Sequence, residues 1–137
     1  MFIVEDSEIV RENLQTMLSG ISGVAVAGHA VDEAGAIEGI DALLPEVVIL
    51  DLHLQHGSGF NVLANIKKYH AATKVIVLSN YANDSYISLC KRTGADYFFD
   101  KSFQFSRLRS ALLAISSCMA NTDAGSEADN RDGHIIQ

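Results

Sequence analysis

Short apolar runs alternate along the chain with longer segments in which apolar residues recur every three or four positions. Apolar runs rich in β-branched and aromatic residues predict strands, and the longer spacing predicts helices with one buried face. The predicted strands are residues 2–4, 24–30, 47–51, 74–79 and 97–99. Each is followed by a predicted helix, at 7–18, 32–44, 59–69, 83–92 and 103–118.

Five strand–helix units in strict alternation predict an α/β fold, a doubly wound five-stranded parallel sheet with helices on both faces. The runs 47–50 and 75–78 are continuously apolar, as expected of central strands that are buried on both sides. Residues 24–30 are expected to form an edge strand.

The second predicted helix, 32–44, is expected to turn Ile37, Ile40 and Leu44 inward. Gly35 and Gly39 lie inside it, and each costs about 1 kcal/mol relative to alanine. We therefore expect this helix to be marginal in isolation. Gly94 is expected to end the fourth helix as a C-terminal cap.

The periodic pattern stops near residue 118, so residues 1–118 are predicted to form one domain. Residues 119–137 are polar and acidic, and they are predicted to be a disordered tail. The 137 residues carry a net charge of −7, with 48% apolar residues and no long basic run. This composition supports a sizeable core and argues against a nucleic-acid-binding face on this chain.

Cys90 and Cys118 lack metal-ligand spacing and fall in predicted helices, so both are expected to be core thiols. No apolar run approaches the roughly 20 residues of a membrane span. The acids at positions 5 and 6 argue against a secretory leader. We therefore expect a cytoplasmic protein.

Polar side chains follow four of the predicted strands, where ligands collect in open α/β sheets. Acids that are brought together repel one another unless a cation intervenes, and an all-oxygen set suits Mg²⁺. A lysine and a hydroxyl at the same edge could contact phosphoryl oxygens, and an aspartate could accept the group covalently. Each residue alone could be a cap or a surface charge, but their joint occurrence favours a functional site. The residues are Glu5, Asp6, Asp51, Ser79, Asp100 and Lys101.

Four motifs, in this order, resemble the receiver domain of two-component response regulators, the CheY-like family. They are FIVEDSEIVRENL, VVILDLHLQHGSGFNVL, KVIVLSNYAND and GADYFFDKS, and the resemblance spans residues 1 to about 118. It implies the strand order 2-1-3-4-5. It also implies a phosphorylation-activated signalling switch rather than an enzyme, one that assists its own Mg²⁺-dependent phosphorylation and dephosphorylation.

The resemblance implies that Asp51 accepts a phosphoryl group from a histidine kinase or a phosphotransfer protein. Glu5 and Asp6 match the acidic pair of the family. Asp6 would hold Mg²⁺ together with Asp51 and the backbone carbonyl of His53. Lys101 matches the lysine that pairs with the acyl phosphate.

By the same resemblance, Ser79 and Phe98 match the hydroxyl and aromatic switch positions. His53 and Tyr81 are predicted to tune the lifetime of the phosphoryl group. Gln55 and Ser102 depart from the pattern, because many receivers have proline at both positions.

Other families fit the residues less well. A haloacid-dehalogenase-like phosphatase needs a second aspartate at position 53, where this chain has histidine, and the glycine motif of dinucleotide-binding folds is absent. The alternative function that remains open is a phosphorylation-independent protein-interaction module with a receiver fold. The sequence names neither the kinase nor the downstream partner or output domain, and it leaves a homodimer through 83–92 and 103–118 open.

Overall fold

The computed structural model describes residues 1–80, 83–101 and 105–120, and strands and helices alternate along them. The strands are β1 (Phe2–Val4), β2 (Gly28–Ala30), β3 (Val47–Asp51), β4 (Lys74–Ser79) and β5 (Tyr97–Asp100). The helices are α1 (Glu8–Ser19), α2 (Glu33–Leu43), α3 (Gly59–Tyr69), α4 (Asp84–Thr93) and α5 (Phe105–Ala120).

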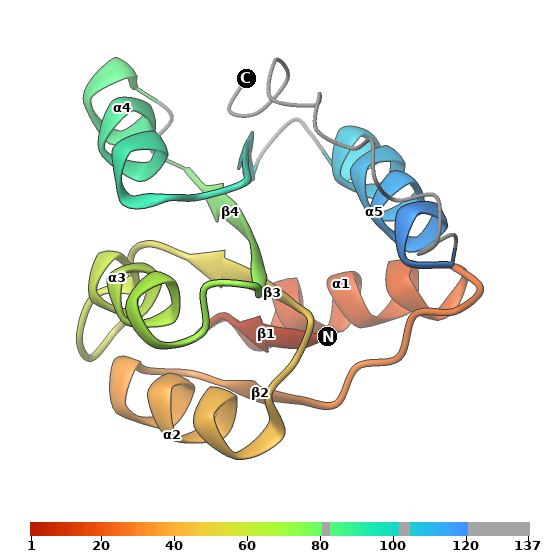
Figure 1. Cartoon of the computed structure of the whole chain (residues 1–137), viewed down its shortest axis with the longest axis horizontal. Helices are drawn as coiled ribbons and strands as arrows, with labels where there is room; N and C mark the ends of the chain where they lie inside the picture. Colours follow the sequence, from red (N-terminus) through yellow and green to blue (C-terminus); the bar gives the residue numbers. More distant parts are fainter. Residues whose placement is uncertain (81–82, 102–104, 121–137) are drawn as a thin grey trace.

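The sheet has the order β2-β1-β3-β4-β5, and every neighbouring pair is parallel. Helices α1 and α5 cover one face, while α2, α3 and α4 cover the other (Figure 1). The predicted doubly wound α/β fold and its strand order are therefore confirmed. Asp51 is in register with Leu78, and Ser79 with Asp100, so the carboxyl ends of β3, β4 and β5 meet at one edge.

Each face of the sheet has its own apolar core. Cys90 lies in the core beneath α2, α3 and α4, where burial raises the pKa of its thiol to about 11. This confirms the predicted core thiol at that position, whereas the side chain of Cys118 lies outside the described part of the chain. The core on the α1 and α5 face includes Leu14, Leu18, Leu108, Leu112 and Ile115.

Side-chain caps fix where four of the helices begin. Ser7, Asp32, Ser58 and Asn83 each accept a hydrogen bond from a backbone N–H in the first turn of the following helix. The chain leaves α4 through Gly94, whose φ of 111° confirms the predicted glycine cap.

The second strand is shorter than the sequence predicts. The strand itself comprises only Gly28–Ala30, in register with the three residues of β1. Before it, the Ala27 N–H donates to the Met1 carbonyl at 2.7 Å, and the Met1 ammonium donates to the Ala25 carbonyl at 3.0 Å. Val24 and Val26 pack, half-buried, against the core beneath α1 and α5. Their apolar character reflects this packing rather than a longer strand.

The end of the second helix also differs from the prediction. Leu44 was expected to face inward, but its side chain is 64% exposed because the helix ends one residue earlier. Leu44 adopts a left-handed conformation with φ 47°, and Pro45 follows it. A residue before proline is disfavoured in the right-handed helical region, so the helix stops there.

The two glycines of α2 have a packing role that the helix pattern does not reveal. A Cβ atom at Gly39 would lie 2.6 Å from the ring of Phe2, and one at Gly35 would lie 2.9 Å from Asp32 Oδ1. The glycines therefore let α2 approach β1 and its own cap closely. Among the described helices, none is both long and apolar enough to cross a membrane.

Candidate functional site

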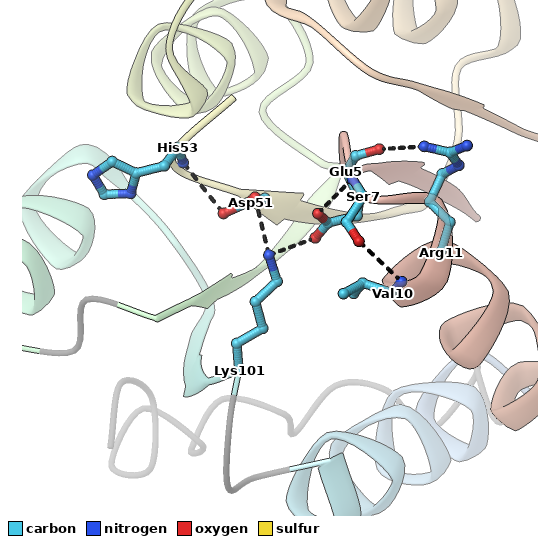
Figure 2. Close-up of polar contacts among 7 residues, drawn as sticks. All are labelled: Glu5, Ser7, Val10, Arg11, Asp51, His53 and Lys101. Atoms are coloured by element: carbon cyan, nitrogen blue, oxygen red, sulfur yellow. Dashed lines mark hydrogen bonds and ion pairs between the residues drawn. The ribbon is translucent and has the colours of Figure 1, made fainter. Parts of the chain in front are cut away.

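Asp51 is the last residue of β3, and its position at the end of a central strand leaves it only 5% exposed. Both carboxylate oxygens have partners (Figure 2). The backbone N–H of His53 donates to Oδ1 at 3.2 Å, and Lys101 Nζ donates to Oδ2 at 3.1 Å. The sheet therefore presents a buried, oriented carboxylate at its carboxyl edge.

The turn between β1 and α1 supplies a second buried acid. Glu5 is 1% exposed, and its Oε2 accepts a hydrogen bond from the backbone N–H of Ser7 at 3.0 Å. Arg11 donates from Nη1 to the backbone carbonyl of Glu5 at 2.9 Å, one turn into α1. The start of the helix thus holds Glu5 by both its cap and its first turn.

Lys101 connects these two segments. Its backbone N–H donates to the carbonyl of Ser79 at 2.9 Å, which places the residue beside the end of β4. Its ammonium lies 2.9 Å from Glu5 Oε1 and 3.1 Å from Asp51 Oδ2, and the side chain is 11% exposed. One nearly buried cation therefore serves two carboxylates.

This arrangement shifts the pKa of both groups upward. Burial raises the pKa of Glu5, and the neighbouring Asp51 charge raises it further, against the opposing effect of Lys101. For Lys101, burial alone would lower the pKa, but the hydrogen bond to Glu5 and the nearby carboxylates outweigh it and raise the pKa. One ammonium is shared by two acids, so the cluster carries excess negative charge.

The excess charge extends to Asp6. Glu5, Asp6 and Asp51 each offer a carboxylate oxygen within 4.8 Å of the others, as in a site for a cation. Asp6 is half-buried and borders the two buried acids. An all-oxygen donor set suits a hard divalent ion such as Mg²⁺. The residues present therefore fit that ion.

The loop after Asp51 is folded tightly against the strand. Ser58 pairs with His53 across the loop, and the N–H of Gly59 donates to the carbonyl of Leu52 at 2.9 Å. A Cβ atom at Gly59 would lie 2.2 Å from the Asp51 carbonyl oxygen, so only glycine permits this approach. Gly57 has a φ of 95°, a conformation that favours glycine.

The structure places the remaining predicted residues around this edge. Ser79 is completely buried, one residue beyond the partner of Asp51 on β4. Phe98 is 1% exposed, so its ring already occupies an inward position in the core beneath α4. The predictions for Tyr81 and for Ser102 lie outside the described residues.

The exposed imidazole of His53 has a neighbour on α4. Its ring meets Tyr86 edge-on at 5.4 Å between centroids, and Tyr86 stacks on Phe60 at 5.7 Å. Sequence reasoning missed Tyr86, and it also missed Ser7 and Arg11. A serine directly before a predicted helix is a recognisable capping signal. The contact between Tyr86 and His53 joins distant residues and leaves no such signal in the nearby sequence.

The parallel fold and its acid–lysine edge define a receiver-type α/β domain. The family model for the response regulator receiver domain matches residues 1–113. The chain therefore belongs to the receiver-domain family of response regulators.

Individual relatives agree with this assignment. The chain is 29% identical over 116 residues to the chemotaxis protein CheY of Thermotoga maritima, covering 85% of this chain and 96% of that protein. It is 30% identical over 109 residues to the probable transcriptional regulatory protein NarL of Mycobacterium tuberculosis, covering 80% of this chain and 50% of that protein. Several other curated relatives are likewise matched over only 26% to 56% of their length. The solved receiver domain of the putative response regulator NarL from Mycobacterium tuberculosis superposes with a TM-score of 0.77 and 28% identity, covering 85% of this chain and 94% of that one.

Proposed function

We propose that this chain is a phosphorylation-activated switch that accepts a phosphoryl group on Asp51 from a histidine kinase or a phosphotransfer protein. One observation carries the proposal: a carboxylate fixed at the end of a central strand shares a single ammonium with a second buried acid. Lys101 lies at the position where an ammonium would neutralise phosphoryl oxygens.

In the proposed transfer, an Asp51 carboxylate oxygen attacks phosphorus and forms the acyl phosphate bond. The bond between phosphorus and the donor nitrogen breaks, and its electron pair leaves with the donor imidazole. Lys101 exchanges part of its contact with Asp51 for a contact with the phosphoryl oxygens, and Glu5 holds the ammonium in place. The buried hydroxyl of Ser79 is proposed to donate to another phosphoryl oxygen.

Asp6, Asp51 and the backbone carbonyl of His53 are proposed to hold Mg²⁺, with Glu5 in the same cluster. When bound, Mg²⁺ neutralises charge on the acids and on the transferring group, which assists both phosphorylation and dephosphorylation. Glu5 Oε1 and Oε2 already accept from Lys101 and Ser7, so its main proposed role is to position the lysine.

The output is proposed to be a change in the face formed by α4, β5 and α5. The acyl phosphate adds negative charge and acceptor oxygens beside Ser79, and movement of that hydroxyl changes the space next to Phe98. His53 and Tyr81 are proposed to set the water access and so the lifetime of the phosphoryl group. A partner protein that recognises this face, or an output domain outside this chain, is proposed only because receiver domains as a class act through one or the other.

The test is phosphorylation of the chain with acetyl phosphate or phosphoramidate in the presence of Mg²⁺, followed by intact-mass analysis. We expect wild type to gain the mass of one phosphoryl group and Asp51→Asn to gain none. Asp41→Asn is the matched control, because it removes the same charge from an exposed aspartate on α2.

Two results would overturn the proposal. A phosphoryl group that persists on the Asp51→Asn variant would place the acceptor elsewhere. Failure of wild type to react with both donors and with a histidine phosphotransfer protein would favour the alternative, an interaction module that does not use phosphorylation.

A further inference from the structure

Glu33, the first residue of α2, holds the loop that joins β3 to α3. Its Oε1 accepts hydrogen bonds from the backbone N–H of Ser58 at 3.0 Å and from Asn61 Nδ2 at 3.3 Å. Its own backbone N–H donates to the carbonyl of His56 at 3.1 Å. One residue of α2 thus contacts three residues of the loop and of the first turn of α3.

The loop is also shaped to fit this glutamate. A Cβ atom at Gly57 would lie 2.4 Å from the Cβ atom of Glu33, so no side chain could stand between the loop and α2. Gly57 also has a φ of 95°. The backbones of the loop and of α2 therefore lie close together at this contact, which restricts the positions that the Glu33 side chain can adopt.

The Ser58 amide that Glu33 holds is linked to the candidate site through His53. Ser58 is paired across the loop with His53, and the N–H of His53 donates to Asp51 Oδ1 at 3.2 Å. A short chain of contacts therefore runs from Glu33 through Ser58 and His53 to Asp51. Gln55 lies inside this loop, and it lacks the fixed φ that a proline would give the backbone.

We infer that Glu33 is a positioning residue for the acidic site, because it fixes the loop that presents the backbone of His53 to Asp51. The part of the inference that concerns Mg²⁺ rests on the proposed function, in which the His53 carbonyl is a ligand. Outer groups that orient ligands typically change metal affinity by about 10–100-fold when they are removed.

The first test needs neither Mg²⁺ nor a phosphoryl donor. Glu33→Asp keeps the charge but shortens the side chain by one methylene, so it cannot reach Ser58 from the same backbone position. Glu33→Gln keeps the reach and the acceptor oxygen. Glu38→Asp is the matched control, since it shortens an exposed glutamate on the same helix. Thermal unfolding verifies that each variant is folded.

Hydrogen exchange of individual amides is then followed by NMR. In Glu33→Asp, we expect the Ser58 amide to exchange about tenfold faster, as loss of one charge-assisted hydrogen bond predicts. The amide of His53 should exchange faster as well. Glu33→Gln and Glu38→Asp should stay close to wild type.

The second test titrates Mg²⁺ into the same samples and follows amide shifts. We expect Glu33→Asp to weaken Mg²⁺ binding about tenfold, with Glu33→Gln restoring most of the affinity. Unchanged Ser58 exchange in Glu33→Asp would overturn the inference. A Glu38→Asp variant as impaired as Glu33→Asp would also overturn it, because shortening a glutamate that does not contact the loop would then have the same effect. So would a Glu33→Gln variant as impaired as Glu33→Asp, because reach and an acceptor oxygen would then not be enough to hold the loop.

The two proposals fail in different ways. If wild type binds no Mg²⁺ and accepts no phosphoryl group, the proposed function fails, while the exchange data still judge the role of Glu33. If wild type is phosphorylated and Glu33→Asp leaves both exchange and Mg²⁺ affinity unchanged, only the inference about Glu33 fails.

Discussion

Two segments bring acids to the same lysine, yet they are held in different ways. The turn from β1 to α1 carries Glu5, and its contacts join residues two, three and six positions apart. The loop from β3 to α3 follows Asp51, and its contacts with Glu33 join residues 25 and 28 positions apart. Lys101 contacts Glu5 in the turn and Asp51 directly before the loop.

The difference concerns what each segment depends on. A turn closed by neighbours costs little chain entropy and forms together with the helix that it starts. A loop held by a distant helix keeps its shape only while that helix is docked, so its local stability follows the packing of α2. The acid of the turn is therefore the fixed side of the site, and the loop is its adjustable side.

Removal of the shared lysine should have the largest effect. Lys101→Met leaves two buried carboxylates without their cation, and we expect a loss of about 3–5 kcal/mol in the free energy of unfolding near pH 7.5. Urea denaturation measures it. Lys91→Met, at an exposed position of α4, is the control and should change stability little.

The loss should shrink as the pH falls. The raised pKa of Lys101 keeps the ammonium charged throughout the acidic and neutral range, whereas the raised pKa of Glu5 means that this acid protonates at a higher pH than an ordinary glutamate. A protonated Glu5 needs no counter-charge, so the difference between variant and wild type falls as pH drops through the Glu5 pKa. An equal loss at all pH values would assign the effect to packing of the lysine stem.

Adding one methyl group next to the loop from β3 to α3, the adjustable side of the site, should destabilise the protein. Gly59→Ala places a Cβ atom against the backbone carbonyl of Asp51, and we expect a loss of about 3 kcal/mol in unfolding free energy, at the upper end for overpacking. Gly20→Ala is the control, because its added Cβ atom would meet only one carbonyl oxygen at 3.5 Å. Equal stability of the two variants would show that the loop adapts without strain.

A substitution in the turn from β1 to α1, the fixed side of the site, should have the smallest effect on stability, and the effect should stay local. Ser7→Ala removes the cap that accepts from the Val10 N–H, and we expect a loss of about 1 kcal/mol in urea denaturation. Asn83→Ala removes the equivalent cap of α4 and should cost a similar amount. Neither variant should change exchange of the Ser58 amide. Faster exchange in Ser7→Ala would show that the two segments are not independent.

The sequence predicts most of the fold because its signals are local. The continuous apolar runs of β3 and β4 lie within the strands that they define, and the Gly94 cap follows directly on α4, so those bounds agree closely with the structure. The residues of the site are likewise polar side chains at the end of a strand or just after it, as with Asp51 and Glu5. Parallel strand order then brings them to one edge.

What the sequence does not predict depends on distance along the chain. Glu33 reads as an ordinary acid in the first turn of a helix, and only the docked helix reveals its contacts with Ser58 and Asn61. Leu44 fits the spacing of the inward-facing residues of α2, but the following proline ends the helix before Leu44, so its side chain does not face the core. Val24 and Val26 have strand-like composition, but they lie before β2 and pack, half-buried, against the core beneath α1 and α5.

The glycine at position 39 has a consequence for anyone who would redesign this domain. Replacing helical glycines by alanine is a routine route to a stiffer helix, because alanine has the higher propensity. Here the added methyl carbon would meet the ring of Phe2 at 2.6 Å, so the gain in propensity would be offset by displacement of α2 from the sheet. Stiffening this helix requires a smaller side chain at position 2 in the same step.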